Sequence, residues 1–598
     1  RHDQAMFYID VPNGAVATGL RTLGTRAGRP YWFSGELLEA EAAAEKYREL
    51  TGIGGYYPKD PALLSWRSQG LLALQVFPCP PGGDKVVEYT LVIPTEYRDG
   101  AHHLELPPLG TEQLVASIKA HAADPKDRLL VGGTPPPAII KPEWGTSLDF
   151  ALVPHDTPRL GGNLVATEFA PNRILTRYAV EAAPHLSEVP RGAHIVLVLD
   201  TSLSTDSGFI DRAKLAFDAY LSHFTDASVE LVTFNRKLER PFGGFVTVAD
   251  ARTRLEALAV RRGNGSDVDR ALAEADRLLA GSGAGARRVV MLTDGLTRQG
   301  LTPERLRAAT STSGAALHVG LLDDGPPSLT RNDDHPWASG LRPNHGLVWR
   351  ASVSESASPA ETRTAFEEWA RPKRLDHLHV YSSELGLQTV LEESPAVLDE
   401  GQGFENLLIT ERAAPWLAIE GELWTERVTN TFTLDKKSEK RWSALVFGSS
   451  LLSELSEPEM MTLAVRGGAV SPVTSYLAIE PGVRPSTEGL DWGLGLSGFG
   501  SGGGGMGSGA TSVSGMAPAL DREAFLKGHI ADDWRRCGGR PDTATITLET
   551  TSAEIANIQS VDITVSDALL TTCLREAVWD LVLPAAFSEE WNSFTIRV

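Results

Sequence analysis

Residues His194–Gly208 have the sequence HIVLVLDTSLSTDSG, and this stretch decides the central fold of the chain. Its first part, Ile195–Leu199, is a continuous apolar run, which is typical of a strand buried on both faces of a parallel sheet. The run stops at Asp200, and small hydroxyl residues follow, which indicates a polar loop at the carboxyl edge of the sheet. Ligands of open α/β sheets bind at that edge.

Three side chains with oxygen atoms lie on this single turn, namely Asp200, Ser202 and Ser204. One carboxylate and two hydroxyls supply only oxygen ligands, which suit a hard cation such as Mg²⁺. Mn²⁺ and Ca²⁺ also accept oxygen ligands, so the sequence does not choose among the three cations. The turn therefore predicts a divalent-metal site.

The Asp-x-Ser-x-Ser turn resembles the metal-ion-dependent adhesion site (MIDAS) of von Willebrand factor type A (VWA) domains. Two later segments resemble the family's other ligand segments, GNGSDVDRAL at Gly263–Leu272 and VVMLTDG at Val289–Gly295. The family usually has Thr where this chain has Ser266, and Asp294 follows a buried strand. The resemblance covers residues 191–375 and implies a Rossmann-like fold with a central, mostly parallel sheet.

The same resemblance implies a ligand set and a way of binding a partner. The metal would be held, directly or through water, by Asp200, Ser202, Ser204, Ser266 and Asp294. One coordination position would stay open for an acidic side chain of a protein partner, because Mg²⁺ favours six oxygen ligands. The alternative is a degenerate domain without the ion, which Ser in place of Thr at position 266 supports. Asp206 and Asp267 are interpreted as solvated loop or helix-start residues.

Length and composition indicate several ordinary globular domains. The chain has 598 residues, of which 42% are hydrophobic and 22% are charged. Its net charge of −21 argues against nucleic acid or an anionic membrane surface as the main partner, because both reward basic patches. No apolar run approaches the roughly 18 residues of a membrane span. No signal peptide precedes Arg1, so we expect either a processed chain or a fragment.

Residues 1–120 resemble the vault protein inter-alpha-trypsin (VIT) domain, a β-sandwich-like domain that often precedes a VWA domain. Four segments carry this resemblance in order: Ala5–Gly19, the helical Glu39–Leu50, Asp60–Leu64 and Leu72–Ile93. The family fold normally opens with further strands ahead of the position of Arg1. Without them the sheet keeps an open edge. We expect residues 121–190, or a separate polypeptide chain, to supply these strands.

Three other regions have simpler patterns. Residues 121–190 mix Pro-rich turns with strand-like stretches and are interpreted as a β linker region that joins the first two domains or completes the first.

Asp323–Gly346 contains acidic and His residues without a standard zinc spacing, which predicts a surface loop. Residues 376–482 favour a β-rich domain, a sandwich packed after the VWA domain, with a strand at Trp442–Phe447 and one helix over Leu451–Arg466.

Residues 483–519 are rich in Gly and Ser and cannot bury enough apolar surface to fold, so they predict a flexible linker. Gly493, Gly495 and Gly498 match a G-x-G-x-x-G pattern, but no strand precedes them. Composition explains the match better than a dinucleotide site does.

Residues 520–598 indicate a small α+β C-terminal domain, with strands predicted at Thr543–Glu549 and Val561–Val565. It resembles the C-terminal domain shared by TonB-like proteins and a myxobacterial motility-associated family, mainly through CLREAVWDLVLP at 573–584. In that family a Cys before the first strand accompanies one in the second helix, here Cys537 and Cys573. The resemblance implies a disulfide and an oxidising compartment, and two buried thiols are the alternative.

The chain contains none of the common catalytic signatures, such as H-E-x-x-H, a phosphate loop with G-K-[ST], G-x-S-x-G or C-x-x-C. We therefore expect a non-enzymatic, extracytoplasmic bacterial protein that binds a protein partner through a divalent metal. The alternative is a structural component of a cell-envelope complex, in which the metal is absent or only stabilises the fold. A hydrolase is a third hypothesis. The Asp-Pro-His-Phe motif used for covalent linkage in inter-alpha-trypsin inhibitor heavy chains is absent.

Overall fold

The computed structural model describes the chain apart from residues 1–2, 52–55, 80–81, 109–115, 144, 383–393, 486–519, 552, 565–566 and 588–590. The chain forms two compact units, Arg1–Leu186 with Arg374–Gly503, and Ser187–Lys373 with Gly504–Val598. Each unit is therefore built from two separate stretches of the chain. The linker predicted at 483–519, with its glycine pattern, lies outside the described residues from position 486 onward. Within the described parts, no helix is long and apolar enough to cross a membrane.

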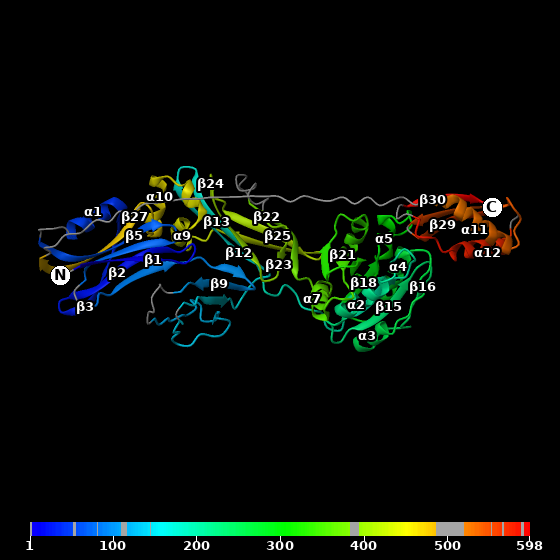
Figure 1. The fold of residues 1–598 in the computed structure, drawn as a ribbon, viewed down its shortest axis with the longest axis horizontal. Coiled ribbons are helices and arrows are strands. Elements are labelled where there is room, and N and C mark those ends of the chain that lie inside the picture. Colours follow the sequence, from blue (N-terminus) through cyan, green and yellow to red (C-terminus); the bar gives the residue numbers. More distant parts are fainter. Residues whose placement is uncertain are drawn as a thin grey trace. The chain divides into compact units, whose positions relative to one another are not determined.

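The N-terminal part of the first unit contains two sheets and one helix (Figure 1). The strand orders are β1-β6-β5-β27-β4 and β3-β2-β7. The strands are β1 (Asp3–Asp10), β2 (Val16–Arg26), β3 (Arg29–Ser34), β4 (Glu36–Glu39), β5 (Tyr56–Ser68), β6 (Leu71–Cys79), β7 (Val87–Val92) and β27 (Thr474–Pro485). Helix α1 (Ala40–Thr51) buries Ala43 and Tyr47 against Leu63 of β5 and Leu477 of β27. Apolar residues at this helical spacing fix the helix on the sheet.

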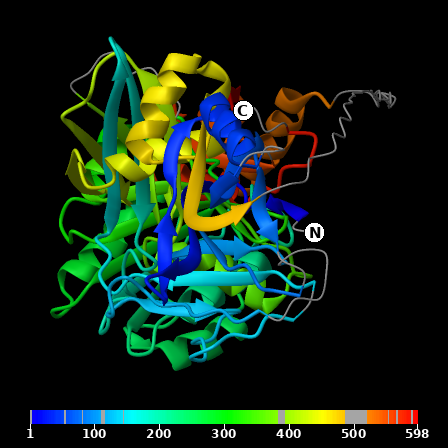
Figure 2. The ribbon, with the colours of Figure 1, turned by 90° about the vertical axis from the view of Figure 1, so that its left-hand side faces the viewer.

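Strand β27 comes from far along the chain and lies inside the N-terminal sheet, between β5 and β4. Figure 2 shows this orange strand beside the blue N-terminal strands. Its residues Leu477 and Ala478 are buried, so the pairing covers apolar surface as well as backbone groups. The two expected sources of additional strands, residues 121–190 and another chain, did not include this segment. The pattern of residues 376–482 does not reveal it, because strand pairing across hundreds of residues leaves no local signal.

The rest of the first unit contains three further sheets. Their orders are β10-β11-β9-β8, β12-β13-β24 and β23-β22-β25-β26. The strands are β8 (Glu96–Arg98), β9 (Ala101–Leu106), β10 (Arg128–Val131), β11 (Leu148–Val153), β12 (Leu160–Ala170), β13 (Arg173–Ala182), β22 (Arg374–Tyr381), β23 (Leu398–Asp399), β24 (Gly403–Thr410), β25 (Trp416–Leu423) and β26 (Glu426–Thr433). The last two sheets share one apolar core, which includes Leu164, Tyr178, Leu375 and Ile419. A sandwich is thus present, but two of its strands, β12 and β13, precede residue 187.

The strand predicted at Trp442–Phe447 is wrong. Helix α9 (Glu439–Leu445) and a 3₁₀ turn, η2 (Val446–Gly448), occupy this position. The run Ala444–Phe447 is buried throughout, and a short apolar run does not distinguish a buried strand from a buried helix. The single helix predicted over Leu451–Arg466 is also divided, into η3 (Ser450–Glu454) and α10 (Glu457–Gly467). A capping box between Ser456 and Glu459 starts α10 there.

The second unit is organised around a mixed sheet with the order β16-β15-β14-β18-β19-β21-β20, and β17 also pairs with β15. The strands are β14 (His194–Asp200), β15 (Ser228–Phe234), β16 (Leu238–Glu239), β17 (Val246–Thr247), β18 (Arg287–Thr293), β19 (Ala316–Asp323), β20 (Ser328–Arg331) and β21 (Gly346–Ser352). The five longest strands, β14, β15, β18, β19 and β21, pair in parallel. This arrangement agrees with the α/β sheet expected from the apolar run at Ile195–Leu199.

Helices cover both faces of this sheet (Figure 1). They are α2 (Phe209–Leu221), α3 (Val248–Glu256), α4 (Val268–Ala280), α5 (Pro303–Ala309), α6 (Ala338–Leu341) and α7 (Pro359–Ala370). Val196 and Val198 of β14 share one core with α4, α5 and α6. Ile195, Leu197 and Leu199 point to the opposite face and are fully buried too. Burial on both faces explains why this strand has no polar alternation.

The surface loop predicted at Asp323–Gly346 is only partly correct, because the segment contains secondary structure. Strand β20 pairs antiparallel with β21 and extends the sheet, and α6 follows with a 3₁₀ turn, η1 (Arg342–Asn344). Asp333 pairs with Arg331 at 2.9 Å and with Arg342 at 3.6 Å. The carboxylate is thus held by arginines of the same segment. Pro and Gly mark chain turns but do not exclude a short edge strand between them.

The C-terminal domain of the second unit has α11 (Arg522–Arg536), β28 (Ala544–Thr551), β29 (Glu554–Ile563), α12 (Ala568–Trp579) and β30 (Asn592–Arg597). Its sheet has the order β29-β28-β30, and Ile530, Trp534, Ile546 and Leu574 share its core. Strand β29 begins seven residues before the predicted start at Val561. The predicted disulfide is confirmed, since Cys537 and Cys573 are bonded with a Cα–Cα distance of 5.9 Å.

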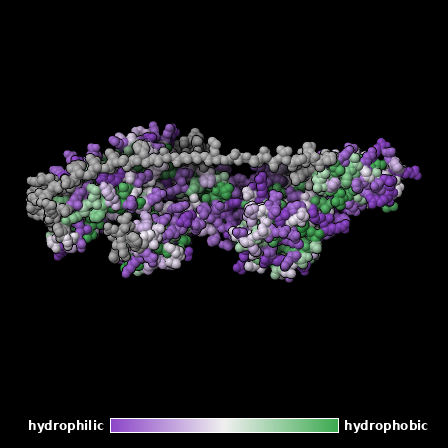
Figure 3. Space-filling view, in the orientation of Figure 1, coloured by the Kyte–Doolittle hydropathy of each residue, from purple (hydrophilic) through white to green (hydrophobic). Residues whose placement is uncertain are grey.

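On the face seen in Figure 3, hydrophilic residues predominate, and hydrophobic residues occur in small groups, one of them on the C-terminal domain. This distribution agrees with the net charge of −21. Such a face favours few, local binding sites over broad apolar contact.

Gly320 tests the packing between β19 and α7. A Cβ at this position would lie 2.7 Å from the ring of Trp369 and 2.9 Å from Leu292. We expect Gly320→Ala to lower the free energy of unfolding by about 1–3 kcal/mol, measured by urea titration, because the core would be overpacked. Gly300→Ala, where a Cβ meets open space, is the matched control. Equal stability of both variants would contradict the packing.

The disulfide gives a second prediction. Cross-linking residues that lie 36 positions apart is expected to stabilise the C-terminal domain by about 2–4 kcal/mol. Dithiothreitol, or Cys573→Ser, should therefore lower the melting temperature of that domain, whereas Cys79→Ser should not. The check is to count the reactive thiols in the unfolded, unreduced protein. One reactive thiol, that of Cys79, is expected, and three would refute the bond.

Candidate functional site

The three segments that carry the MIDAS resemblance meet at the carboxyl edge of the mixed sheet. Asp200 ends β14 and Thr293 ends β18, and these strands pair in parallel. The loop before α4 joins them, because the Gly263 N–H donates to the Thr201 carbonyl at 3.0 Å. Parallel pairing places strand ends side by side, so residues 94 positions apart, Asp200 and Asp294, reach one site.

Asp200 is fully buried and held by two hydrogen bonds. Its Oδ1 accepts from the Ser202 N–H at 2.9 Å, and its Oδ2 accepts from the Thr293 hydroxyl at 2.6 Å. The hydroxyls of Ser202 and Ser204 lie 2.9 Å apart. One carboxylate and two hydroxyls therefore share the same turn in space, as their spacing in the sequence suggests.

Asp294 leaves one oxygen without a hydrogen-bond partner. Its Oδ1 accepts from the Leu296 N–H at 2.9 Å, whereas its Oδ2 is buried and accepts no hydrogen bond from the described residues. Burial raises the pKa of Asp294. Burial, and then the charge of Asp294, raise the pKa of Asp200 well above its usual value. The buried carboxylate of Asp200 and the buried Oδ2 of Asp294 make a region in which a cation would be stabilised.

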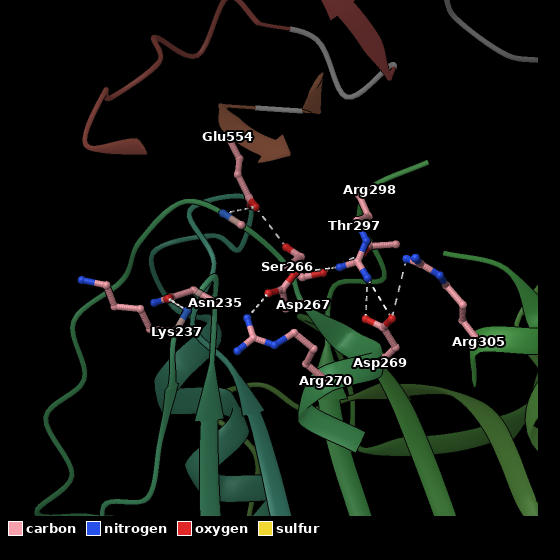
Figure 4. A network of polar contacts seen from close by, with 11 residues as sticks. Asn235, Lys237, Ser266, Asp267, Asp269, Arg270, Thr297, Arg298, Arg305 and Glu554 are labelled. Carbon is pink, nitrogen blue, oxygen red and sulfur yellow. Dashed lines mark hydrogen bonds and ion pairs between the residues drawn. The ribbon is translucent and has the colours of Figure 1, made fainter. Parts of the chain in front are cut away.

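Ser266, which is 1% exposed, donates its hydroxyl to Glu554 Oε1 at 3.0 Å. The Gly265 N–H donates to the same oxygen at 2.9 Å, and the Ser204 N–H donates to Oε2 at 2.8 Å. Figure 4 shows Glu554 pointing from β29 toward this loop. Gly265 has a φ of +93°, and a Cβ there would lie 2.8 Å from Arg236, so the close loop contact requires glycine.

Glu554 is itself completely buried. Burial raises its pKa to about 7, hydrogen bonds from Ser204 and Ser266 oppose the shift, and the charge of Asp294 adds to it. The carboxylates of Asp200, Asp294 and Glu554 therefore belong to one electrostatically linked cluster, set among hydroxyl groups.

The residues present fit a divalent cation. All candidate donors are oxygen atoms, which Mg²⁺, Mn²⁺ and Ca²⁺ prefer, and the unpartnered Oδ2 of Asp294 is available to such an ion. His, Cys, Asp and Glu side chains alone do not suffice, since no group of three or more of them among the described residues could hold a metal. The candidate centre thus depends on the hydroxyls of Ser202, Ser204 and Ser266. The ligand set stays a prediction.

The neighbouring acidic residues are paired with arginines. Asp206 accepts from the Gly208 N–H at 2.8 Å and pairs with Arg212. Asp267 is the N-terminal cap residue of α4 and pairs with Arg298 at 2.6 Å (Figure 4). These contacts agree with the interpretation of Asp206 and Asp267 as loop and helix-start residues rather than ligands.

Several residues of this site are not among those predicted from the sequence. Thr293 holds Asp200, and its place at the end of an apolar strand beside Asp294 is a signal that could have identified it. Arg262 donates from Nη2 to the Leu203 carbonyl at 2.9 Å and so supports the first loop. Glu554 lies 288 positions from Ser266, at the start of a strand predicted to begin later, and no local motif marks it.

The family model described as "von Willebrand factor type A domain" matches residues 195–296. This match confirms the VWA resemblance for the central segment. The VIT and C-terminal resemblances stay predictions. A comparison with curated proteins finds no significant match.

Solved structures with similarity to this chain include three of interest. An aerotolerance-related membrane protein from Bacteroides fragilis is 17% identical, over 30% of this chain and 98% of its own, with a TM-score of 0.24. A von Willebrand factor type A protein from Catenulispora acidiphila is 14% identical, over 52% and 87%, with a TM-score of 0.26. Mussel byssus proximal thread matrix protein 1, with a zinc-occupied MIDAS motif, is 16% identical, over 31% and 46%, with a TM-score of 0.23.

Asp294→Asn tests the buried charge. Without metal this change is expected to stabilise the protein by about 1–2 kcal/mol, because it removes one of two neighbouring buried carboxylates. Added Mg²⁺ should raise the melting temperature of the wild type and leave that of the variant unchanged. Thermal unfolding with chelator and with Mg²⁺ measures both effects. Asp211→Asn, a change to a side chain that is 64% exposed, is the control. A less stable Asp294→Asn protein in chelator would contradict the prediction.

Proposed function

We propose that this protein binds a divalent cation at Asp200, Ser202, Ser204, Ser266 and Asp294 and uses the cation to hold an acidic side chain of a protein partner. The observation that carries the proposal is the position of Glu554, whose carboxylate is bound by Ser266 and by two backbone N–H groups at this same edge. A place that accepts one carboxylate of this chain is chemically suited to a carboxylate of another.

The residues of the proposed metal site have different roles. Asp200 and Asp294 supply negative charge, and the serine hydroxyls supply neutral donors. Thr293 fixes the orientation of Asp200 through its 2.6 Å hydrogen bond. When bound, the cation would neutralise the local carboxylates, so that an acidic chain with a net charge of −21 could hold an acidic partner.

The proposed role is non-enzymatic, that of an adhesion or scaffold protein. No catalytic signature occurs in the sequence, and the site residues described above contain hydroxyls and carboxylates without an adjacent His that could act as a base. The proposed location is extracytoplasmic, in the periplasm, on the outer membrane or at the cell surface of a bacterium. The Cys537–Cys573 disulfide supports this location, because such bonds persist in oxidising compartments.

Metal binding is tested first. Mn²⁺ titration followed by electron paramagnetic resonance should detect a site in the full chain, and Asp200→Asn should weaken it at least about tenfold, the effect of losing roughly 1.4 kcal/mol of interaction. Asp211→Asn should bind like the wild type. A wild-type chain that binds no Mn²⁺, Mg²⁺ or Ca²⁺ would exclude the metal-dependent mechanism.

Partner binding is tested next, with wild type and Asp200→Asn used to capture proteins from a cell envelope, each with Mg²⁺ and with chelator. A partner retained only by the wild type with Mg²⁺ is expected. Equal recovery in all four conditions would favour the structural alternative instead.

That alternative, assembly through a sheet edge, rests on β1. This strand is the end strand of its sheet and exposes Met6, Phe7 and Tyr8, which are 42%, 53% and 61% exposed. An apolar end strand is a place where another chain can add a strand, as expected for the separate polypeptide considered above. In this second function the metal would only stabilise the fold.

A further inference from the structure

The C-terminal domain contacts the predicted metal site of its own chain. Glu554 is the first residue of β29, and its side chain is 0% exposed. Its two oxygens accept three hydrogen bonds, of 2.8 Å from the Ser204 N–H, 2.9 Å from the Gly265 N–H and 3.0 Å from the Ser266 hydroxyl. All three donors belong to loops that carry predicted metal ligands.

Asn264 fixes the same domain on the same loop. This residue is 2% exposed, and its Oδ1 accepts from the Ile555 N–H at 2.9 Å. Its Nδ2 donates to the carbonyls of Trp579 and Leu581, both at 2.7 Å. One side chain between Gly263 and Gly265 therefore holds both the start of β29 and the end of α12. Buried amides that satisfy three hydrogen bonds orient their neighbours closely.

Charge complementarity surrounds this contact. Arg236, in the loop after β15, pairs with Glu576 at 2.7 Å and lies 3.5 Å from Asp580, both in the C-terminal domain. Its guanidinium also lies 5.5 Å from the ring centre of Trp579. Arg236 thus meets two carboxylates of the C-terminal domain beside the loop that carries Ser266.

The negative charge of the buried Glu554 carboxylate is unfavourable unless a positive charge lies beside it. Among the described residues, no Lys, Arg or His forms an ion pair with it, although a buried carboxylate costs several kcal/mol unless it is paired. Its neighbours Ser204 and Ser266 are predicted metal ligands, and both donate a hydrogen bond to it, Ser204 from its N–H and Ser266 from its hydroxyl. A cation bound by these residues would supply the missing positive charge.

We propose, on the basis of the function proposed above, that Glu554 is an internal ligand, with which the C-terminal domain occupies the partner-binding face of the metal site in the same chain. The domain acts as an autoinhibitory element, because the carboxylate of a partner and that of Glu554 compete for one position. A partner binds when the C-terminal domain leaves, and it must then replace the contacts of Glu554, Asn264 and Arg236.

Hydrogen exchange of the full chain with Mg²⁺, read by mass spectrometry, tests this contact. In Glu554→Gln, peptides that cover residues 202–206 and 263–268 are expected to exchange at least about tenfold faster, because undocked loops open with little free energy. Peptides of β28 should keep their protection, which shows that the domain remains folded. Glu523→Gln, on the exposed first turn of α11, is the matched control and should behave like the wild type.

A charge swap at Arg236, which is not a predicted metal ligand, also tests the contact. Arg236→Glu is expected to speed exchange of the same peptides, because it places a negative charge beside Glu576 and Asp580. The double variant Arg236→Glu with Glu576→Arg should restore protection. Failure of both Glu554→Gln and Arg236→Glu to speed exchange would overturn the internal-ligand proposal.

Mn²⁺ binding to the same samples separates the two proposals. Glu554→Gln is expected to bind Mn²⁺ about tenfold more weakly, through loss of one charged ligand. One outcome would overturn the internal ligand and leave the proposed function intact. In it, the wild type binds Mn²⁺, and Glu554→Gln has the same Mn²⁺ affinity and the same hydrogen exchange as the wild type. A wild-type chain without Mn²⁺ binding would overturn both. The loops could instead be protected from hydrogen exchange only at high protein concentration, with a dimeric mass in sedimentation. That result would show that Glu554 contacts a second copy of the chain, and it would overturn the same-chain contact.

Discussion

The parallel pairing of β14 with β18 is the constraint on which the candidate site depends. It places the carboxyl ends of two buried strands next to each other, so that Asp200 and Asp294 share one small region although 94 residues separate them. Both strands are buried on both faces, which leaves their polar groups only the sheet edge. The Thr293 hydroxyl and the Ser202 N–H then hold Asp200, and the cluster of carboxylates follows from this geometry.

Buried charge also explains why the C-terminal domain matters to this edge. Glu554 brings a third carboxylate to two that already repel each other, and its backbone and hydroxyl donors reduce that cost only in part. A cation would turn a costly arrangement into a favourable one. The disulfide between Cys537 and Cys573 stabilises the small C-terminal domain, which stays folded when it leaves the site in the proposed mechanism.

Sequence patterns were informative where a structural feature leaves a signal within a short segment of the chain. The buried strand at Ile195–Leu199 and the disulfide were both predictable, because burial on both faces and a family cysteine pattern each leave a signal. The run at Trp442–Phe447 was misassigned as a strand, since four consecutive buried apolar residues fit a buried helix equally well. The insertion of β27 into the N-terminal sheet had no sequence signal at all.

The central strand and the Asp-x-Ser-x-Ser turn could be predicted from local sequence, and so could the later segments that contain Ser266 and Asp294. The contact of Glu554 with Ser266, and the pairing of Asp206 and Asp267 with arginines, became visible only in the folded chain. The physical reason is distance along the chain. A hydrogen bond between residues 288 positions apart depends on how two domains pack, and that packing leaves no periodic or local trace in either segment.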